Sequence, residues 1–180
     1  MTIELVGHDP SWSEQADRLI GDLRCLLGDT VARLDHVGST SIPGLMTKPK
    51  LHIDVVLCPG ISPEPVSIRL EEFGYANLGY LHNLKEIQLT RSKGFCFGPR
   101  QSEPELSVLA HRLCICRSDC LAPVKRRRFR DALRNNPTLV QEYEKLKQDL
   151  IAKFGNPPDW DRYNGGKTDF INAVVEDHFQ

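Results

Sequence analysis

A Gly-Ser turn lies one short loop before a predicted strand that carries His52 and Asp54. The turn consists of Gly38, Ser39, Thr40 and Ser41. Its backbone N–H groups and hydroxyls are of the kind that hold phosphate oxygens. His52 and Asp54 are two residues apart, so on a strand their side chains point to the same face. Acidic groups in such a place hold divalent metal beside a phosphate chain. The residues alone are equally compatible with a plain β-turn followed by a chance strand acid.

The turn is part of a longer string, and other segments of the chain extend the pattern. The string is His36-Val37-Gly38-Ser39-Thr40-Ser41-Ile42-Pro43-Gly44-Leu45, followed by Lys48-Pro49. The further segments are His8-Asp9-Pro10-Ser11-Trp12, the helical stretch 129–147 and Lys167-Thr168-Asp169-Phe170-Ile171. Together they resemble the GrpB family over most of the chain. This family comprises small proteins with a nucleotidyltransferase-like fold, also found fused to some dephospho-CoA kinases.

The resemblance implies a metal-dependent nucleotidyltransferase. A small mixed sheet is flanked by helices, the turn cradles a nucleoside triphosphate, and strand acids bind Mg²⁺ or another divalent metal. Asp54 and His52 would be the catalytic and metal-binding positions, and the acceptor is unknown. Lys48 and Lys167 are further phosphate-binding candidates, with an ordinary surface lysine as the alternative at each position.

Two positions depart from the family pattern. His52 stands where the family usually has Asp, and histidine is a poor ligand for Mg²⁺. Histidine is a better ligand for zinc, manganese or nickel. The alternative is that His52 is a hydrogen-bonded core residue. In the stretch Ala110-His111-Arg112-Leu113-Cys114, Cys114 replaces the second histidine of a His-x-Leu-His pattern. His111 and His36 remain additional site candidates, with packed strand histidines as the alternative. Whether the chain is an enzyme is therefore open.

Two other functions fit the same residues. One is a catalytically weakened or inactive module that binds a nucleotide or phosphorylated metabolite on the same fold. The other is an interaction domain that acts through the basic run Lys125-Arg126-Arg127-Arg128 with Arg130. A run of this kind could contact RNA or an acidic partner, but it is also typical of a solvated helix face.

The elements that must position these residues follow from periodicity and turn signals. A helix begins at Ser11 after Asp9-Pro10 and ends at Gly28, with apolar residues at helical spacing. Strands are predicted over Val31–Val37, Leu51–Leu57, Glu86–Arg91, Gly94–Phe97 and Ser107–Cys116. Helices are predicted over Pro65–Phe73 and Lys125–Leu133, from Asn136-Pro137 to Phe154, and from Thr168 onward. The sum is an α+β fold with a nucleotidyltransferase-like mixed sheet and a helical C-terminal third.

Composition sets the outer bounds. The 180 residues suit one domain, 1–180, with an α+β core over 1–121 and a helical part over 122–180. The net charge of -1 argues against bulk nucleic-acid binding. There is no apolar run of the roughly 20 residues that span a bilayer, and no export signal, so we expect a cytoplasmic protein.

The six cysteines are expected to be free thiols in that reducing compartment. Cys114, Cys116 and Cys120 are not expected to hold zinc, because Cys-x-Cys-x-x-x-Cys lacks a second ligand pair.

Overall fold

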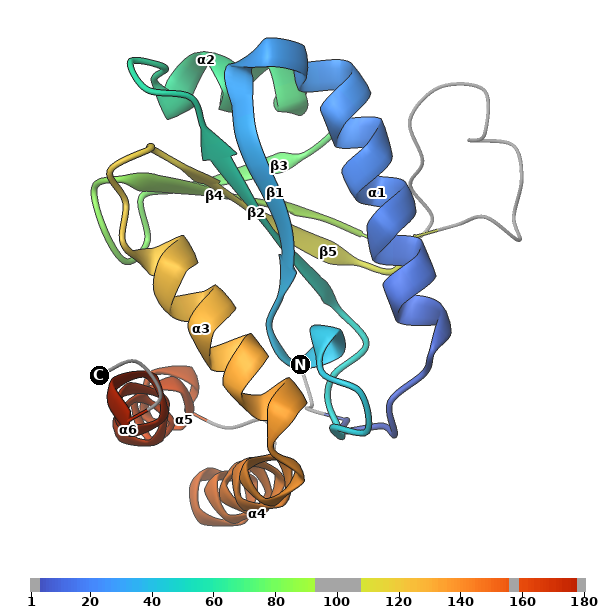
Figure 1. The fold of residues 1–180 in the computed structure, drawn as a ribbon, viewed down its shortest axis with the longest axis vertical. Helices are drawn as coiled ribbons and strands as arrows, with labels where there is room; N and C mark the ends of the chain where they lie inside the picture. Colours follow the sequence, from blue (N-terminus) through green and yellow to red (C-terminus); the bar gives the residue numbers. More distant parts are fainter. Residues whose placement is uncertain (1–3, 93–107, 156–158, 178–180) are drawn as a thin grey trace.

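A five-stranded mixed sheet in the order β1-β2-β5-β4-β3 forms the centre of the protein, seen in a computed structural model (Figure 1). The structure describes residues 4–92, 108–155 and 159–177. Strands β2 and β5 are parallel, and the other neighbours are antiparallel. The strands are β1 (Val31–Val37), β2 (Leu51–Leu57), β3 (Ala76–Gly79), β4 (Glu86–Arg91) and β5 (His111–Cys116).

One face of the sheet is apolar and packs on two helices. Alternate residues of β2, from Leu51 to Leu57, are fully buried on this face. They pack in one core with α1 (Ser11–Leu27) and α2 (Pro63–Glu71). Because strand side chains alternate, His52 and Asp54 must lie on the opposite face.

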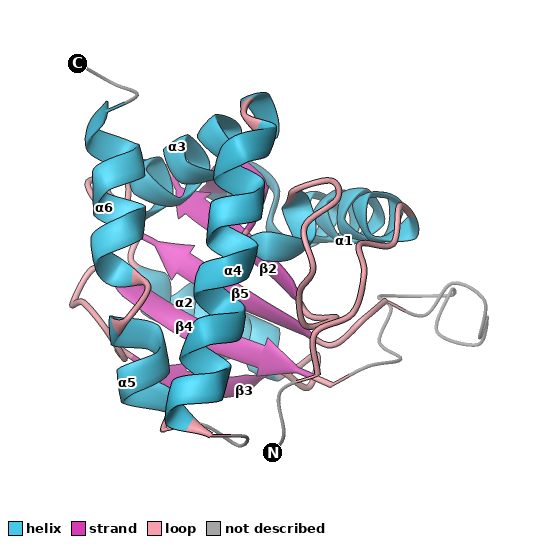
Figure 2. Cartoon of the chain, turned by 90° about the horizontal axis from the view of Figure 1, so that it is seen from below, coloured by secondary structure: helices cyan, strands magenta, loops and turns pink. Residues whose placement is uncertain are grey.

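The opposite face meets the helical C-terminal part of the chain (Figure 2). Its helices are α3 (Ala122–Asn135), α4 (Pro137–Phe154), α5 (Trp160–Gly165) and α6 (Thr168–Asp177). A second core joins Ile42 and Leu45 to Phe129, Tyr143 and Val174. This core holds the helices beside the Gly-Ser turn. The sheet face that carries His52 and Asp54 is therefore covered by the helices.

The predicted α+β fold, a mixed sheet flanked by helices with a helical C-terminal third, is confirmed. Strands β1, β2 and β4 have the predicted bounds, whereas β5 begins at His111 rather than Ser107. The second helix spans Pro63–Glu71, and α3 is longer than Lys125–Leu133. Strand β3 and helix α5 were not predicted. The predicted strand at Gly94–Phe97 lies outside the described residues.

Over the described residues, the helices are too short or too polar to cross a membrane.

The side chain of Asn136 should stabilise the first turn of α4. Its side chain accepts hydrogen bonds from the backbone N–H groups of Thr138 and Leu139, which have no partner within the helix. We expect Asn136→Ala to lower the free energy of unfolding by about 1 kcal/mol. Asn136→Ser retains a capping oxygen and should stay close to wild type. Urea unfolding monitored by circular dichroism compares the three proteins, and an unchanged Asn136→Ala midpoint would contradict the capping role.

Candidate functional site

A cavity of about 490 Å³ lies between the polar face of the sheet and the C-terminal helices. Small-molecule sites occupy roughly 300–1,000 Å³. Ser39, Lys48, Lys50, His52 and Arg112 line it from the sheet and the segments before β2. The helical part contributes Tyr143, Lys147, Tyr163, Asn164 and Lys167. The helical third therefore builds about a third of the cavity wall.

Five lysine and arginine side chains face this cavity, and its described lining contains no carboxylate. Burial lowers the pKa of Lys50 to about 8, and the charges of Arg112 and Lys48 add to this. Burial likewise lowers the pKa of Lys167 to about 8, with a contribution from Lys48. Such mutual repulsion is relieved when an anion enters, so the cavity is built for negative charge.

Lys147 of α4 is only 3% exposed at this cavity. Burial lowers its pKa to about 8, against the attraction of Glu144. Its ammonium donates to the carbonyl of Met46 and lies 5.2 Å from the centroid of the Tyr143 ring. Lys167 is held in a similar way over Tyr163, at 4.2 Å from the ring centroid. The aromatic rings thus position both ammonium groups.

The Gly-Ser turn lines the cavity through Ser39, and its Gly38 lies against His52 of the same lining. Gly38 has a φ of 75°, and a Cβ there would lie 3.2 Å from Nδ1 of His52. Only glycine allows this close approach without strain. Burial, followed by the charges of Arg112 and Lys50, lowers the pKa of His52 to about 3. The imidazole is therefore neutral at physiological pH and adds no further charge to the cavity wall.

The other predicted turn residues support the loop from within. Ser41 Oγ donates to the carbonyl of Gly38 at 2.6 Å, which closes the turn. Thr40 is buried, and its hydroxyl lies 3.0 Å from Nε2 of His36. His36 is itself buried, which lowers its pKa to about 4. These three residues brace the turn rather than line the cavity.

His111 is placed on the other face of the sheet, away from the cavity. It is fully buried and lies in register with Leu51. Burial lowers its pKa to about 4. Because a carbonyl oxygen can only accept, Nδ1–H donates to the Leu109 carbonyl at 2.8 Å. Nε2 then accepts from the Tyr75 hydroxyl at 2.7 Å. These contacts are those of a packed strand histidine, not of a residue that faces the cavity.

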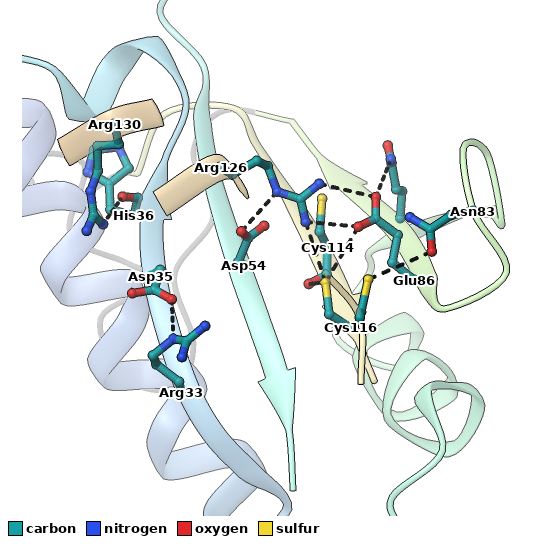
Figure 3. Close-up of polar contacts among 12 residues, drawn as sticks. Arg33, Asp35, His36, Asp54, Asn83, Glu86, Cys114, Cys116, Arg126 and Arg130 are labelled. Atoms are coloured by element: carbon teal, nitrogen blue, oxygen red, sulfur yellow. Dashed lines mark hydrogen bonds and ion pairs between the residues drawn. The ribbon is translucent and has the colours of Figure 1, made fainter. Parts of the chain in front are cut away.

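Asp54 lies on the same sheet face as His52, beneath α3 rather than in the cavity lining (Figure 3). Its Oδ2 accepts from Nε of Arg126 at 2.9 Å. The other end of the same guanidinium donates to Glu86 of β4 at 2.9 Å. Burial raises the pKa of Asp54 to about 6, and Arg126 opposes this rise. Both carboxylates are thus already occupied by one arginine.

Three side chains beside this ion pair could together hold a soft metal. The ligand atoms of Glu86, Cys116 and Cys120 all lie within 4.8 Å of one another. Thiolate ligands favour zinc. However, Nη2 of Arg126 lies 3.5 Å from Cys116 Sγ and also binds Glu86. The absence of zinc at these cysteines stays a prediction.

Several residues of the site were not assigned a role from sequence. Lys50 and Arg112 share strand parity with His52 and Cys114, so alternation could have found them. Lys147 belongs to the helical stretch that carries the family resemblance, but no role was predicted for it. Arg126 belongs to the basic run, but the structure directs its side chain inward, and Arg130 likewise donates to the His36 carbonyl at 2.9 Å. The run is therefore partly structural rather than a solvated face.

The chain is similar to known proteins over nearly its whole length. The family model described as "GrpB protein" matches residues 2–177. A UPF0157 protein of Pseudomonas aeruginosa is 27% identical over 96% of this chain, and the chain spans 66% of that protein's length. The "Glutamate-rich protein GrpB" of Alkalihalophilus pseudofirmus is 27% identical over 96% of this chain and 94% of its own.

A solved structure and a group of kinases complete the comparison. The crystal structure of GrpB from Enterococcus faecalis superposes with a TM-score of 0.74 at 25% identity, over 97% of this chain and 96% of that one. A dephospho-CoA kinase of Mycolicibacterium paratuberculosis is 45% identical, but over only 23% of this chain and 10% of the kinase.

The lowered lysine pKa values predict opposite pH trends for stability and for anion binding. The pKa of Lys50, Lys147 and Lys167 is about 8 in the folded protein, against an ordinary value of 10.5. Between these values the unfolded chain binds more protons, so the free energy of unfolding should rise with pH. Over the same window the cavity loses positive charge, and pyrophosphate binding should weaken. Urea unfolding and calorimetric titration at pH 7, 8, 9 and 10 measure both trends, and pyrophosphate affinity that is constant to pH 10 would contradict the assignment.

Proposed function

The chain belongs to the GrpB family, and on that premise we propose that its cavity binds a small phosphorylated ligand without a metal ion. The observation that carries the proposal is the lining of the cavity by five lysine and arginine side chains with no carboxylate among its described residues. Charge-assisted hydrogen bonds from these groups to phosphate oxygens are among the strong polar contacts in proteins.

Arg112 is the side chain best suited to a phosphate group. One terminal nitrogen of its guanidinium donates to Gln88 at 3.1 Å, which fixes its orientation on β5. Its Nε is buried without a hydrogen-bond partner among the described residues. A guanidinium presents donors in a planar fork that matches two phosphate oxygens. Lys48 and Lys50 flank it as point charges, so one phosphate is expected at this end of the cavity.

The remaining wall suits an organic group attached to the phosphate. Leu5 and Leu81 line the cavity together with the rings of Tyr143 and Tyr163. Aromatic and aliphatic surfaces of this kind bury the flat or apolar part of a ligand, while a few polar groups fix its orientation. A nucleotide or a phosphorylated metabolite therefore fits the chemistry better than a bare inorganic anion.

The described residues do not fit the Mg²⁺ that the family resemblance implies. Mg²⁺ takes oxygen ligands in near-octahedral geometry. His52 offers nitrogen, and the carboxylates of Asp54 and Glu86 are bound to Arg126. We therefore derive no chemical step that passes through a metal ion.

Nucleotidyl transfer to an unknown acceptor is the second candidate. Family membership favours it, as does the placement of Asp35, Asp54 and Glu86 on one face of the sheet. Turnover of a labelled nucleoside triphosphate separates transfer from binding. Release of pyrophosphate that disappears in Asp54→Asn would support transfer, and intact triphosphate after prolonged incubation would support binding alone.

Binding itself is tested by removing single charges. A ligand at 100 times its Kd adds about 2.7 kcal/mol to stability, so ATP and pyrophosphate should raise the melting temperature. Lys50→Met and Lys147→Met retain side-chain length but remove one cavity charge, and each should weaken pyrophosphate binding by about tenfold, or 1.4 kcal/mol. Lys125→Met, at an exposed position on α3, is the matched control and should bind as wild type does. Equal affinities in all four proteins would rule out the cavity as the site.

A further inference from the structure

We propose that Arg126 is a built-in cation that takes the place of a divalent metal between Asp54 and Glu86. The protein then needs no metal at this position, and removal of Arg126 creates a metal site. The inference deepens the proposed metal-free binding but concerns a different set of side chains, so each can fail without the other.

The geometry of the ion pair resembles a bridge between two acidic ligands. Arg126 enters from α3, with Nε at 2.9 Å from Oδ2 of Asp54 and Nη2 at 2.9 Å from Oε2 of Glu86. Nη1 lies 3.4 Å from the other oxygen of Glu86. Both carboxylates are almost fully buried, at 0% and 1% exposure. Two buried carboxylates need a positive charge between them, and here the chain itself supplies it.

Strand register explains why a guanidinium fits here. Asp54 lies on β2 and Glu86 on β4, and β5 runs between them. The residue of β5 in register with Asp54 is Cys114, whose side chain is small. Arg126 therefore lies over Cys114 and Cys116 and reaches both neighbouring strands (Figure 3). A larger residue at position 114 would occupy this space.

The charges of the cluster hold the guanidinium in place. Burial works against its charge, but Asp54 and Glu86 outweigh burial and raise the pKa of Arg126. Burial raises the pKa of Glu86, but its hydrogen bonds to Arg126 and Gln88 bring it below the ordinary range. An entering divalent cation would therefore meet a permanent positive charge at short range.

One carboxylate oxygen retains the capacity to bind a cation. Oδ1 of Asp54 is buried and has no hydrogen-bond partner among the described residues. With Arg126 gone, this oxygen, Oδ2 and the carboxylate of Glu86 would face one another across β5. Oxygen ligands of this kind suit Mn²⁺, which is also a sensitive paramagnetic probe.

The test is a titration with Mn²⁺ alone, followed by electron paramagnetic resonance. Arg126→Met keeps the aliphatic stem and removes the charge, and it should bind Mn²⁺ at least about tenfold more tightly than wild type. Arg126→Lys retains a charge and should not gain affinity. Arg128→Met, at an exposed position of the same helix, is the matched control. The gain should disappear in Arg126→Met/Asp54→Asn and increase in Arg126→Met/His52→Asp.

Mn²⁺ binding by the wild-type protein gives a test that does not depend on the folding of Arg126→Met. Stoichiometric Mn²⁺ binding by wild type that is lost in Asp54→Asn would overturn the proposal. Folded Arg126→Met with wild-type Mn²⁺ affinity would overturn it as well. Pyrophosphate titration of wild type in EDTA is the separate readout: absence of binding there refutes the phosphate site and leaves the role of Arg126 untouched.

Discussion

The ion pair of Arg126 with Asp54 and Glu86 is the contact on which the arrangement of the site depends. It joins α3 to two strands that are not neighbours. Removing one partner of a buried ion pair leaves an uncompensated charge, which costs about 3–5 kcal/mol. Because α3 leads directly into α4 and the second core, this contact also holds the helices that complete the cavity. Local electrostatics at the sheet and the position of the distant cavity wall are therefore linked.

The cationic cavity destabilises the folded protein, because it holds like charges close together. Its lysines repel one another and are partly withdrawn from water, so their pKa values fall. The second core, with Phe129 and Tyr143, supplies apolar burial that offsets this repulsion. The folded protein without ligand thus keeps a cavity of mutually repelling charges. Entry of an anion would lower the free energy of this cavity. This is the expected relation between a stable scaffold and a strained binding site.

The sequence predicts the fold better than the site, and the reason is the range of the interactions involved. Strands β1 and β2 have strong local signals, namely alternation and flanking turns, and their bounds are correct. Strand β3 is short, partly exposed and ends at Gly79, so it has no such signal. The Gly-Ser turn and His52 are visible as a motif. The roles of Arg126 and Lys147 depend on where α3 and α4 pack, which no local pattern specifies.

The residues at positions 52 and 114 become intelligible together with Arg126. Histidine at position 52 places no acid in the cavity wall, and the charged side chains of the described lining are all cationic. Cysteine at position 114 leaves space above β5 for a guanidinium. Arg126 then satisfies the acids that remain on this face. A decayed metal site would leave carboxylates buried and unpaired, whereas here each carboxylate that faces Arg126 has a partner. Arg126 thus supplies fixed positive charge beneath α3, and the lysines and Arg112 supply it in the cavity. The proposed binding of phosphate requires this arrangement, because arginine and lysine side chains can neutralise and orient phosphate as a metal ion does elsewhere.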